Sequence, residues 1–434
     1  MAIVSADFGS EPRGLAPGVH IREKGPTPGT GLATGVPLFV GFVFVEARLP
    51  GTEKDERERP KPVRLASWDR FAATVGSARP GGFLAYAVRG FFENGGKRCV
   101  VLPLVRDKTE TAAETLSQAL KGVFQPEMQR FDHRGLRVLD DFDGLEDVDL
   151  VCVPDLMIAE IRQSEHGRQM VLDVQQQVLG YCRDTGDRFA ILDVWAGEVG
   201  AAKGRERAEA ARQHWRDLAS PDGALYGPWV LVPSLDGPGT VWVPPCGHVA
   251  GIYARTDAGV GFHKAPANEI VHGVMDVQFE FTQEDQAQLN DVGVNCLVSF
   301  PRRGIRVWGA RTLSQHRNWR YVNVRRIFLT LVRWIHHHMD DVTFEPNDPA
   351  LWDRTRERLT GFCYELFQRG ALKGLTPEEG FFVKCDAELN RLEEREEGKV
   401  LCEVGLAALS PVELILIRIT RSAAGTTVVA AGGA

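Results

Sequence analysis

The sequence predicts an α/β protein with a distinct C-terminal domain, and three features of the chain support this. An apolar run at 36–45, an amphipathic helical stretch at 82–94 and a second apolar run at 98–105 follow one another. A strand, a helix and a further strand in this order are typical of a parallel sheet covered by helices. Farther along, residues 323–369 contain two clearly punctuated helical stretches, and the two ends of the chain lack the periodic apolar pattern of a core.

The composition is that of a globular protein. The chain has 434 residues, which at roughly 100–200 residues per domain suggests two or three domains. Apolar residues make up 44% and charged residues 25%. The net charge of −7 shows no basic excess, so we expect no nucleic-acid partner. No apolar run approaches the roughly 20 residues of a bilayer span, and the start lacks a secretory signal pattern, so we expect cytosolic synthesis without membrane insertion.

The first domain is predicted to span residues 19–300. Val19 and Ile21 alternate with polar residues, as in a half-buried strand, and 48–64 is a charged, proline-rich solvated loop. In the helix at 82–94 the apolar residues share one face, and Gly95 follows its end, where left-handed backbone is needed. Further strands are expected at 149–153, 189–194, 228–232 and 240–243, and further helices at 170–183 and 203–218.

The second domain is predicted to span residues 301–419. One helix covers 323–339, and the next begins at the N-cap Asp348, continues through Pro349 and ends before Gly370. Thr376 begins a Thr-Pro-Glu-Glu sequence that predicts a capping box. Strands are expected at 381–385, 400–404 and 414–419, and a Gly, Ala, Thr and Val tail follows.

Patterns that would carry chemistry are weak. The eight cysteines are scattered, none forms a C-x-x-C pair, and most lie in apolar runs, so we expect buried free thiols. The glycines at 29–35 precede a strand and lack nucleotide-loop spacing. Residues 336–338 are three consecutive histidines, which point about 100° apart on a helix and cannot share one metal-binding face. Cys246 and His248 lack further ligands at zinc spacing.

Two acids were weighed as catalytic candidates. Asp155 and Asp193 follow predicted strands, where active-site residues often lie, but helix caps and turns use aspartate there equally. The chain contains no G-x-S-x-G elbow. We therefore expect no catalytic site, no metal and no cofactor.

The C-terminal half carries a family resemblance. Gly-Ile-Arg-Val-Trp-Gly-Ala-Arg-Thr-Leu at 304–313 resembles contractile tail sheath proteins of phages, R-type bacteriocins and extracellular contractile injection systems. The resemblance continues through 319–326, Phe-Glu-Pro-Asn-Asp at 344–348 and further short matches up to Asn390. Upstream, 17–21, 91–96 and 247–255 also match.

The resemblance implies a subtilisin-like α/β middle domain without protease activity, an α+β C-terminal sheath domain and extended β-arms. The divisions we expect are an N-terminal arm at 1–18, the α/β domain at 19–300 with variable loops at 46–62 and 107–147, the sheath domain at 301–419 and a C-terminal arm at 420–434. In this family such arms add strands to sheets of neighbouring subunits. The residues expected to take part are Val19, Ile21, Thr426, Thr427, Val428 and Val429.

The implied function is mechanical. Subunits polymerise helically around an inner tube, alone or with sheath paralogues, and contraction drives the tube through a target membrane, with baseplate and cap proteins as further partners. Arg302, Arg303, Arg325 and Arg326 either contact an acidic tube surface or form local salt bridges. The alternatives are a baseplate or cap protein of the same machine, or a hydrolase on the subtilisin-like fold.

Overall fold

The computed structural model describes residues 32–44, 61–75, 81–106, 112–125, 139, 145–195, 204–339, 342, 344–409, 415–422 and 425–431. Contacts divide the chain into residues 1–32 and residues 33–434, and the fold described here is that of the second unit. The predicted strand at Val19 and Ile21 and the arm at 1–18 lie outside the described residues, as does most of the loop at 46–62.

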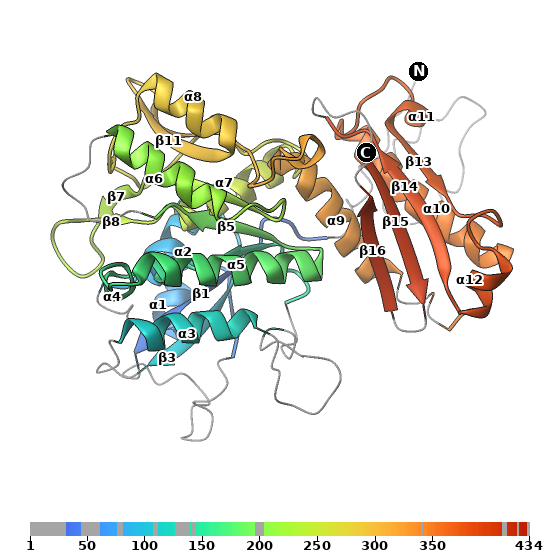
Figure 1. The fold of residues 1–434 in the computed structure, drawn as a ribbon, viewed down its shortest axis with the longest axis horizontal. Helices are drawn as coiled ribbons and strands as arrows, with labels where there is room; N and C mark the ends of the chain where they lie inside the picture. Colours follow the sequence, from blue (N-terminus) through green and yellow to red (C-terminus); the bar gives the residue numbers. More distant parts are fainter. Residues whose placement is uncertain are drawn as a thin grey trace, which may run out of the picture. The chain divides into compact units, whose positions relative to one another are not determined.

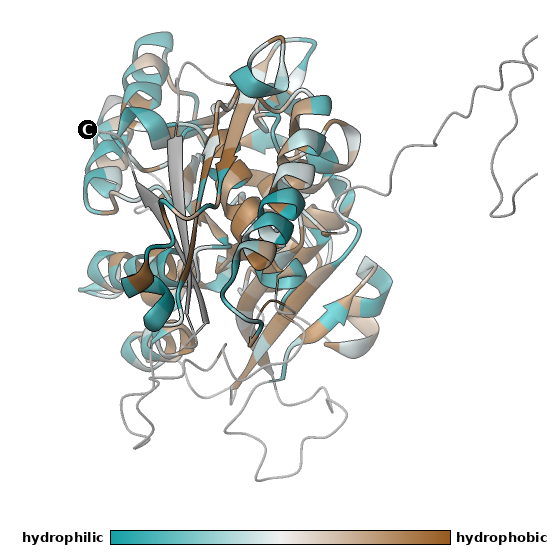
Figure 2. Ribbon diagram, turned by 90° about the vertical axis from the view of Figure 1, so that its right-hand side faces the viewer, coloured by the Kyte–Doolittle hydropathy of each residue, from teal (hydrophilic) through white to brown (hydrophobic). Residues whose placement is uncertain are grey.

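A nine-stranded sheet forms the centre of the α/β part (Figure 1). Its order is β2-β3-β1-β4-β5-β6-β11-β12-β9, and the six consecutive strands from β3 to β11 run parallel. The strands are β1 (Pro37–Phe44), β2 (Val63–Leu65), β3 (Cys99–Arg106), β4 (Leu150–Cys152), β5 (Phe189–Asp193), β6 (Gly223–Gly227), β9 (Glu269–Ile270), β11 (Val294–Phe300) and β12 (Gly304–Trp308). The parallel strands are mostly apolar because helices cover both faces of the sheet, and brown strands run through the centre of Figure 2.

Chain direction decides which helix covers which face. Right-handed crossovers that advance from β3 through β4 and β5 to β6 place α3, α5 and α6 on one face, whereas the reversed step from β1 to β3 places α2 on the other. The helices are α1 (Trp68–Thr74), α2 (Leu84–Glu93), α3 (Ala113–Phe124), α4 (Ala159–Arg162), α5 (Gly167–Thr185), α6 (Gly204–Arg216), α7 (Cys246–Gly259) and α8 (Gln283–Val292), with a 3₁₀ turn at Pro154–Met157.

Helices α2 and α7 pack unusually closely. A Cβ added at Gly247 would lie 2.2 Å from the carbonyl oxygen of Ala87, and one at Gly251 would lie 2.5 Å from that of Phe91. Glycine at these two positions therefore allows backbone-to-backbone contact between the helices. A small antiparallel sheet of β7 (Val230–Pro233), β8 (Thr240–Val243) and β10 (Asp276–Val277) adjoins this region in the order β10-β7-β8.

The C-terminal part combines helices with an antiparallel sheet of order β13-β14-β15-β16. Its helices are α9 (Val322–His338), α10 (Pro349–Gln368), α11 (Pro377–Gly380) and α12 (Leu392–Glu396), and its strands are β13 (Phe381–Lys384), β14 (Val400–Leu406), β15 (Ile415–Ser422) and β16 (Gly425–Ala431). The Asp348 side chain accepts a 2.9 Å hydrogen bond from the Leu351 backbone, and Gly370 has φ +70°, so both predicted ends of α10 are confirmed.

Three predictions of local structure need correction. The capping box at Thr376 is wrong, because its side chain caps nothing and the Glu379 carboxylate accepts instead from the Leu375 backbone at 2.7 Å. The end of the predicted loop 48–64 enters strand β2, which gains hydrogen bonds along the edge of β3. The expected variable loop at 107–147 contains helix α3, whose apolar side chains pack against α5.

The expected domain limits cut through paired strands. A division after residue 300 separates β11 from β12, which form one antiparallel hairpin of the large sheet. An arm beginning at residue 420 starts within β15, and β16 pairs with β15 of the same chain. Thr426–Val429 therefore lie in a strand, as their β-propensity suggests, and face residues 418–421 across the hairpin.

A buried charge cluster under helix α9 is the candidate functional site

Helix α9 connects the large sheet to the C-terminal part and carries three arginines on its inward side. Its apolar residues recur at helical spacing, and Arg326 and Arg333 lie seven residues apart among them, so both project from the same face. Arg326 is 2% exposed and Arg333 is 1% exposed. Two cations at these depths need anions, since an unpaired buried charge is strongly unfavourable.

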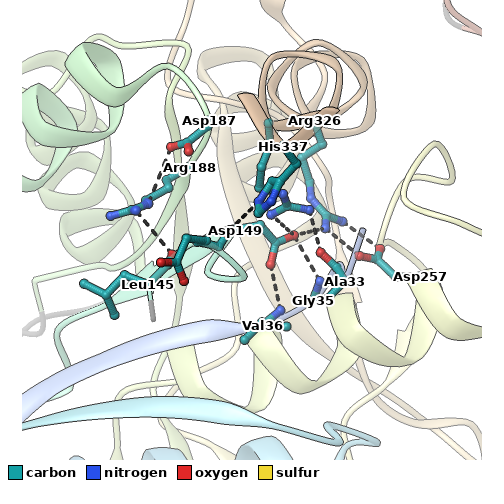
Figure 3. A network of polar contacts seen from close by, with 12 residues as sticks. Ala33, Gly35, Val36, Leu145, Asp149, Asp187, Arg188, Asp257, Arg326 and His337 are labelled. Atoms are coloured by element: carbon teal, nitrogen blue, oxygen red, sulfur yellow. Dashed lines mark hydrogen bonds and ion pairs between the residues drawn. The ribbon is translucent and has the colours of Figure 1, made fainter. Parts of the chain in front are cut away.

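Arg326 is bound by two aspartates (Figure 3). Its Nη1 and Nη2 donate to the two carboxylate oxygens of Asp257, on α7, at 2.7 and 2.6 Å. Nη2 also donates to Oδ2 of Asp149, which directly precedes β4, at 3.0 Å. The guanidinium lies 5.0 Å from the ring centroid of Tyr253. This planar two-oxygen contact is the geometry that arginine forms best with carboxylates.

Asp149 ties the cluster to the start of β1. Its Oδ1 accepts from the Val36 backbone at 2.7 Å, and its Oδ2 accepts from the Gly35 backbone at 3.0 Å. Arg333 lies 3.8 Å from the same carboxylate and donates to the Ala33 carbonyl at 2.6 Å. Residues 33–36 are thus held by one side chain from just before β4 and one from α9.

The cluster is electrically balanced. Asp149, Asp257, Arg326 and Arg333 contribute two negative and two positive charges, all on buried side chains. Burial disfavours the charged form of Arg326, but Asp257 and Asp149 outweigh this and raise the pKa of Arg326 above its ordinary value. The arginine therefore stays charged, and its positive charge is neutralised inside the chain.

A second ion pair fixes the beginning of the same helix. Arg325 Nε and Nη2 both donate to Oδ1 of Asp222, just before β6, at 3.0 and 2.7 Å. The side chains of Arg325 and Asp222 are 12% and 1% exposed. The Arg325 guanidinium also lies 4.9 Å from the ring centroid of Trp319. We name Arg325, Arg326 and Arg333 with Asp149, Asp222 and Asp257 the α9 junction.

The four arginines singled out in the sequence fall into two groups. Arg325 and Arg326 belong to the α9 junction. They form salt bridges within the chain, and these salt bridges are buried and not on the surface. Arg302 and Arg303 are exposed in the turn between β11 and β12. Arg303 donates to the Asn268 side chain at 3.3 Å and lies 5.4 Å from the ring centroid of Phe300.

Sequence reasoning missed the acidic half of the α9 junction. The signal that could have found it is the pair of arginines within the apolar stripe of α9, since such cations require buried carboxylates. Nothing local identifies which aspartates these are, because Asp149 lies 177 residues from Arg326.

The two candidate acids, Asp155 and Asp193, accept hydrogen bonds from backbone N–H groups. Asp155 accepts from the Phe42 backbone at 2.6 Å and from the Phe83 and Leu84 backbones at the start of α2. Asp193 accepts from Cys246 at the start of α7 at 2.8 Å, and burial raises the pKa of Asp193 to about 7. Helix α2 lacks a capping side chain of its own, so Asp155 supplies the cap from a distant segment.

The remaining sequence candidates also have definite places. All eight cysteines are buried. The three histidines end α9, where His338 stacks on Trp334 at 4.8 Å and His337 lies 3.3 Å from the Glu146 carbonyl. Within the described ranges, no group of three His, Cys, Asp or Glu side chains is arranged to hold a metal. No helix in that part of the chain is long and apolar enough to cross a bilayer.

Comparison with known proteins assigns the family. The phage tail sheath protein central domain matches residues 137–313, and the phage tail sheath C-terminal domain follows directly at 314–421. Together they cover well over half of the chain. The chain belongs to the phage tail sheath protein family. Its two domain matches meet just after β12, between the large sheet and helix α9.

Individual sheath relatives and solved structures agree with this. A Pseudomonas aeruginosa strain UCBPP-PA14 protein described as a prophage major tail sheath protein is 28% identical over 177 residues, which are 39% of this chain and 44% of that protein. The chain thus aligns with less than half of that relative's length. A chain of the anti-feeding prophage helical sheath in the contracted state is 29% identical, with TM-score 0.65, 92% of this chain and 97% of that chain covered. A chain of the anti-feeding prophage baseplate in the contracted state is 27% identical, with TM-score 0.70 and coverages of 92% and 96%.

Proposed function

We propose that this chain is the repeating subunit of a contractile sheath, which polymerises helically around an inner tube and contracts to drive that tube through a target membrane. The observation that carries the proposal is the match to a chain of a contracted helical sheath over 97% of that chain. A match of this extent includes both the α/β part and the C-terminal sheet, so it concerns the whole sheath subunit and not a shared domain. The work is mechanical, and the role requires neither a catalytic site nor a cofactor.

The α9 junction suits a subunit that moves as a rigid body. Contraction of a helical array changes contacts between subunits, and each subunit must transmit force between its central and C-terminal parts. Six charged side chains connect α9 to β4, β6 and α7 at this point. Because buried ion pairs break only at high cost, they resist bending of the subunit there. We place the division between the two domains near residue 313, on the far side of β12.

The central part fits a subtilisin-like fold without its activity. Six parallel strands with helices on both faces support this assignment. The candidate acids Asp155 and Asp193 are engaged with backbone N–H groups of β1, α2 and α7. The alternative to a structural protein is an enzyme, a hydrolase on this fold. Labelling of the purified protein by a fluorophosphonate probe would support the hydrolase over the structural role.

The arms are proposed as the links between subunits. Strands β13 and β16 end the order of the C-terminal sheet, so each presents one backbone edge that no strand of the described chain covers. Edge strands accept further strands readily, and residues 1–18 with Val19 and Ile21 would add to a neighbour's sheet there. Residues 420–434 contain β16, so their exchange would put β16 of one subunit into the sheet of its neighbour in place of the pairing within one chain. Truncation of residues 1–16 or 422–434 is expected to stop polymerisation.

The C-terminal truncation needs a folding control because it also removes β16. Circular dichroism and a thermal melt of each truncated monomer separate loss of assembly from loss of fold. Intact tubes formed by both truncated proteins would contradict the arm proposal.

Contact with the inner tube is proposed for Arg302 and Arg303, the two arginines of the original four that are exposed. The charges of Arg325 and Arg326 are already neutralised within the chain. Reversal of both exposed charges, Arg302→Glu with Arg303→Glu, is expected to leave sheath polymerisation intact and to weaken tube retention. The matched control is Arg183→Glu on α5, whose side chain is 69% exposed. Equal tube retention in both variants would rule this contact out.

Electron microscopy of the purified protein and of native particles tests the main proposal. Long hollow cylinders are expected for a sheath subunit. The similarity to a chain of a contracted baseplate favours, as second candidate, a baseplate or cap component of the same machine, which would give discrete rings. Rings or monomers under all assembly conditions would overturn the sheath proposal.

A further inference from the structure

Two cysteines lie directly opposite one another at the end of the β13–β14 ladder. The register pairs Phe381 with Leu406 and Lys384 with Glu403. Continued by one residue, the same register places Cys385 opposite Cys402. The pair was unremarkable in sequence because 16 residues separate its members and no motif connects them.

The hydrogen-bond pattern shows which kind of cross-strand pair this is. The Ala407 backbone donates to the Gly380 carbonyl at 2.8 Å, so Gly380 and Ala407 form a hydrogen-bonded pair. Pair types alternate along an antiparallel ladder, which makes Cys385 and Cys402, five positions along, a non-hydrogen-bonded pair. The Cα atoms of such pairs lie about 4.5 Å apart, within the range that a disulfide bridges.

Neighbouring contacts hold the two thiols in place. Cys385 Sγ lies 3.5 Å from the Leu401 carbonyl, and the Asn390 side chain pairs with the Leu401 backbone at 2.6 and 3.0 Å. Asn390 thereby takes the place of the next partner in the ladder. A hydrogen bond with Cys385, together with burial, raises the pKa of the Cys402 thiol well above its ordinary value. Both cysteines are buried, at 1% and 2% residue exposure.

We propose that Cys385 and Cys402 are a redox modification site, at which a low-molecular-weight disulfide such as oxidised glutathione converts the two thiols into a cross-strand disulfide. One cysteine thiolate attacks a sulfur of the reagent, forms a mixed disulfide and releases one small thiol. The second cysteine thiolate then attacks the protein sulfur of the mixed disulfide and releases the other small thiol. Two S–H bonds are lost from the protein, one S–S bond forms, and the reagent takes up two electrons and two protons.

Access to the thiols comes from the position of β13. This strand has four residues and lies at the end of the sheet order, so it is bound to a neighbour along one side only. Short edge strands open at low free energy compared with central ones. Opening of β13 exposes Cys385 first, and reclosure brings it back to Cys402.

The chain contains a second thiol contact that serves as an internal comparison. Cys152 Sγ lies 4.0 Å from the Cys246 carbonyl, and both residues are 0% exposed. Cys152 belongs to β4, which has parallel neighbours on both sides in the large sheet. Its exposure requires opening of the core, so this pair is expected to stay reduced under native conditions.

The experiment exposes the full-length protein to oxidised glutathione without denaturant and maps disulfides by mass spectrometry of non-reduced peptides. The expected result is a loss of two hydrogen atoms per chain, located at Cys385 and Cys402, at least about tenfold faster than any bond between Cys152 and Cys246. Cys402→Ser is expected to stop the mass loss, whereas Cys363→Ser, which removes a buried thiol on α10, should leave it unchanged. No bond at Cys385 and Cys402, or equal rates at the two pairs, overturns the proposal.

Hydrogen exchange gives a second readout that does not depend on trapping the bond. Oxidation is expected to slow exchange of the amides of β13 (Phe381–Lys384) at least about tenfold and to leave β4 unchanged. A reductant should restore the original rates. If the β13 amides exchange equally fast in protein whose disulfide has been mapped, the proposal that the disulfide holds the edge strand in place is overturned.

Discussion

Removal of the Arg326 side chain tests the physical basis of the α9 junction. Arg326→Ala deletes three charge-assisted hydrogen bonds, of 2.6, 2.7 and 3.0 Å, and leaves Asp257 without its main counter-charge. The Asp257 side chain is 1% exposed, so in the folded protein it depends on the guanidinium and not on bulk water for compensation of its charge. Loss of one member of a buried pair costs about 3–5 kcal/mol in the free energy of unfolding, and we expect a value in this range.

The assay is urea unfolding followed by tryptophan fluorescence. With a urea dependence of about 3 kcal/mol/M, the midpoint should fall by about 1–2 M. Arg303→Ala, which removes an exposed arginine, is the matched control and should cost about 0.5 kcal/mol or less. The double variant Arg326→Met with Asp257→Leu should recover most of the loss, because it removes the orphaned charge together with its partner.

The pH dependence provides an independent check. Burial raises the pKa of Asp257 and Arg326 lowers it, so in Arg326→Ala burial acts unopposed by that charge. A carboxyl whose folded pKa lies above its unfolded value binds its proton more tightly in the folded state. The variant therefore regains stability as the pH falls through that folded pKa, and its deficit should be smaller at pH 5 than at pH 8. A deficit equal to that of Arg303→Ala, or one independent of pH, would refute this account of the junction.

Three further predictions concern the fold around the junction. Asp155→Asn replaces one carboxylate oxygen with a donor that faces backbone N–H groups, and should lower the free energy of unfolding by about 2–4 kcal/mol, measured by urea unfolding. Gly247→Ala forces a Cβ against the Ala87 backbone and should lower the melting temperature. Gly122→Ala on α3, where a Cβ meets nothing within 4 Å, should leave the melting temperature equal or higher. Equal effects of the two substitutions would contradict the close contact between α2 and α7. Burial, then Arg168, lowers the pKa of His214 to about 3, so the folded state keeps it neutral while the unfolded state protonates near pH 6.5. The stability of the wild type relative to His214→Gln should therefore fall by about 2 kcal/mol between pH 7 and pH 5, and a constant difference would count against a neutral buried histidine.

Features that depend on close neighbours in the chain were predictable. The strand at 36–45, the helix at 82–94 with Gly95 after it, and the Asp348 cap with Gly370 all match the structure within a few residues. Each follows from apolar periodicity or from backbone requirements within one helical turn. The capping box predicted at Thr376 does not form. In this helix of a single turn, the Glu379 carboxylate accepts a hydrogen bond from the Leu375 backbone instead.

The sequence alone determined several strands and helices, the buried nature of the cysteines and the resemblance to sheath proteins, because these depend on composition, period and motif. Only the tertiary structure decided which aspartates pair with Arg325 and Arg326. Asp222 lies 103 residues from Arg325, and Asp149 lies 177 residues from Arg326. The tertiary structure likewise decided that Cys385 faces Cys402, because the register of two strands sets that pairing. Contacts between distant segments arise from packing of the whole chain, and no local pattern encodes which partners meet.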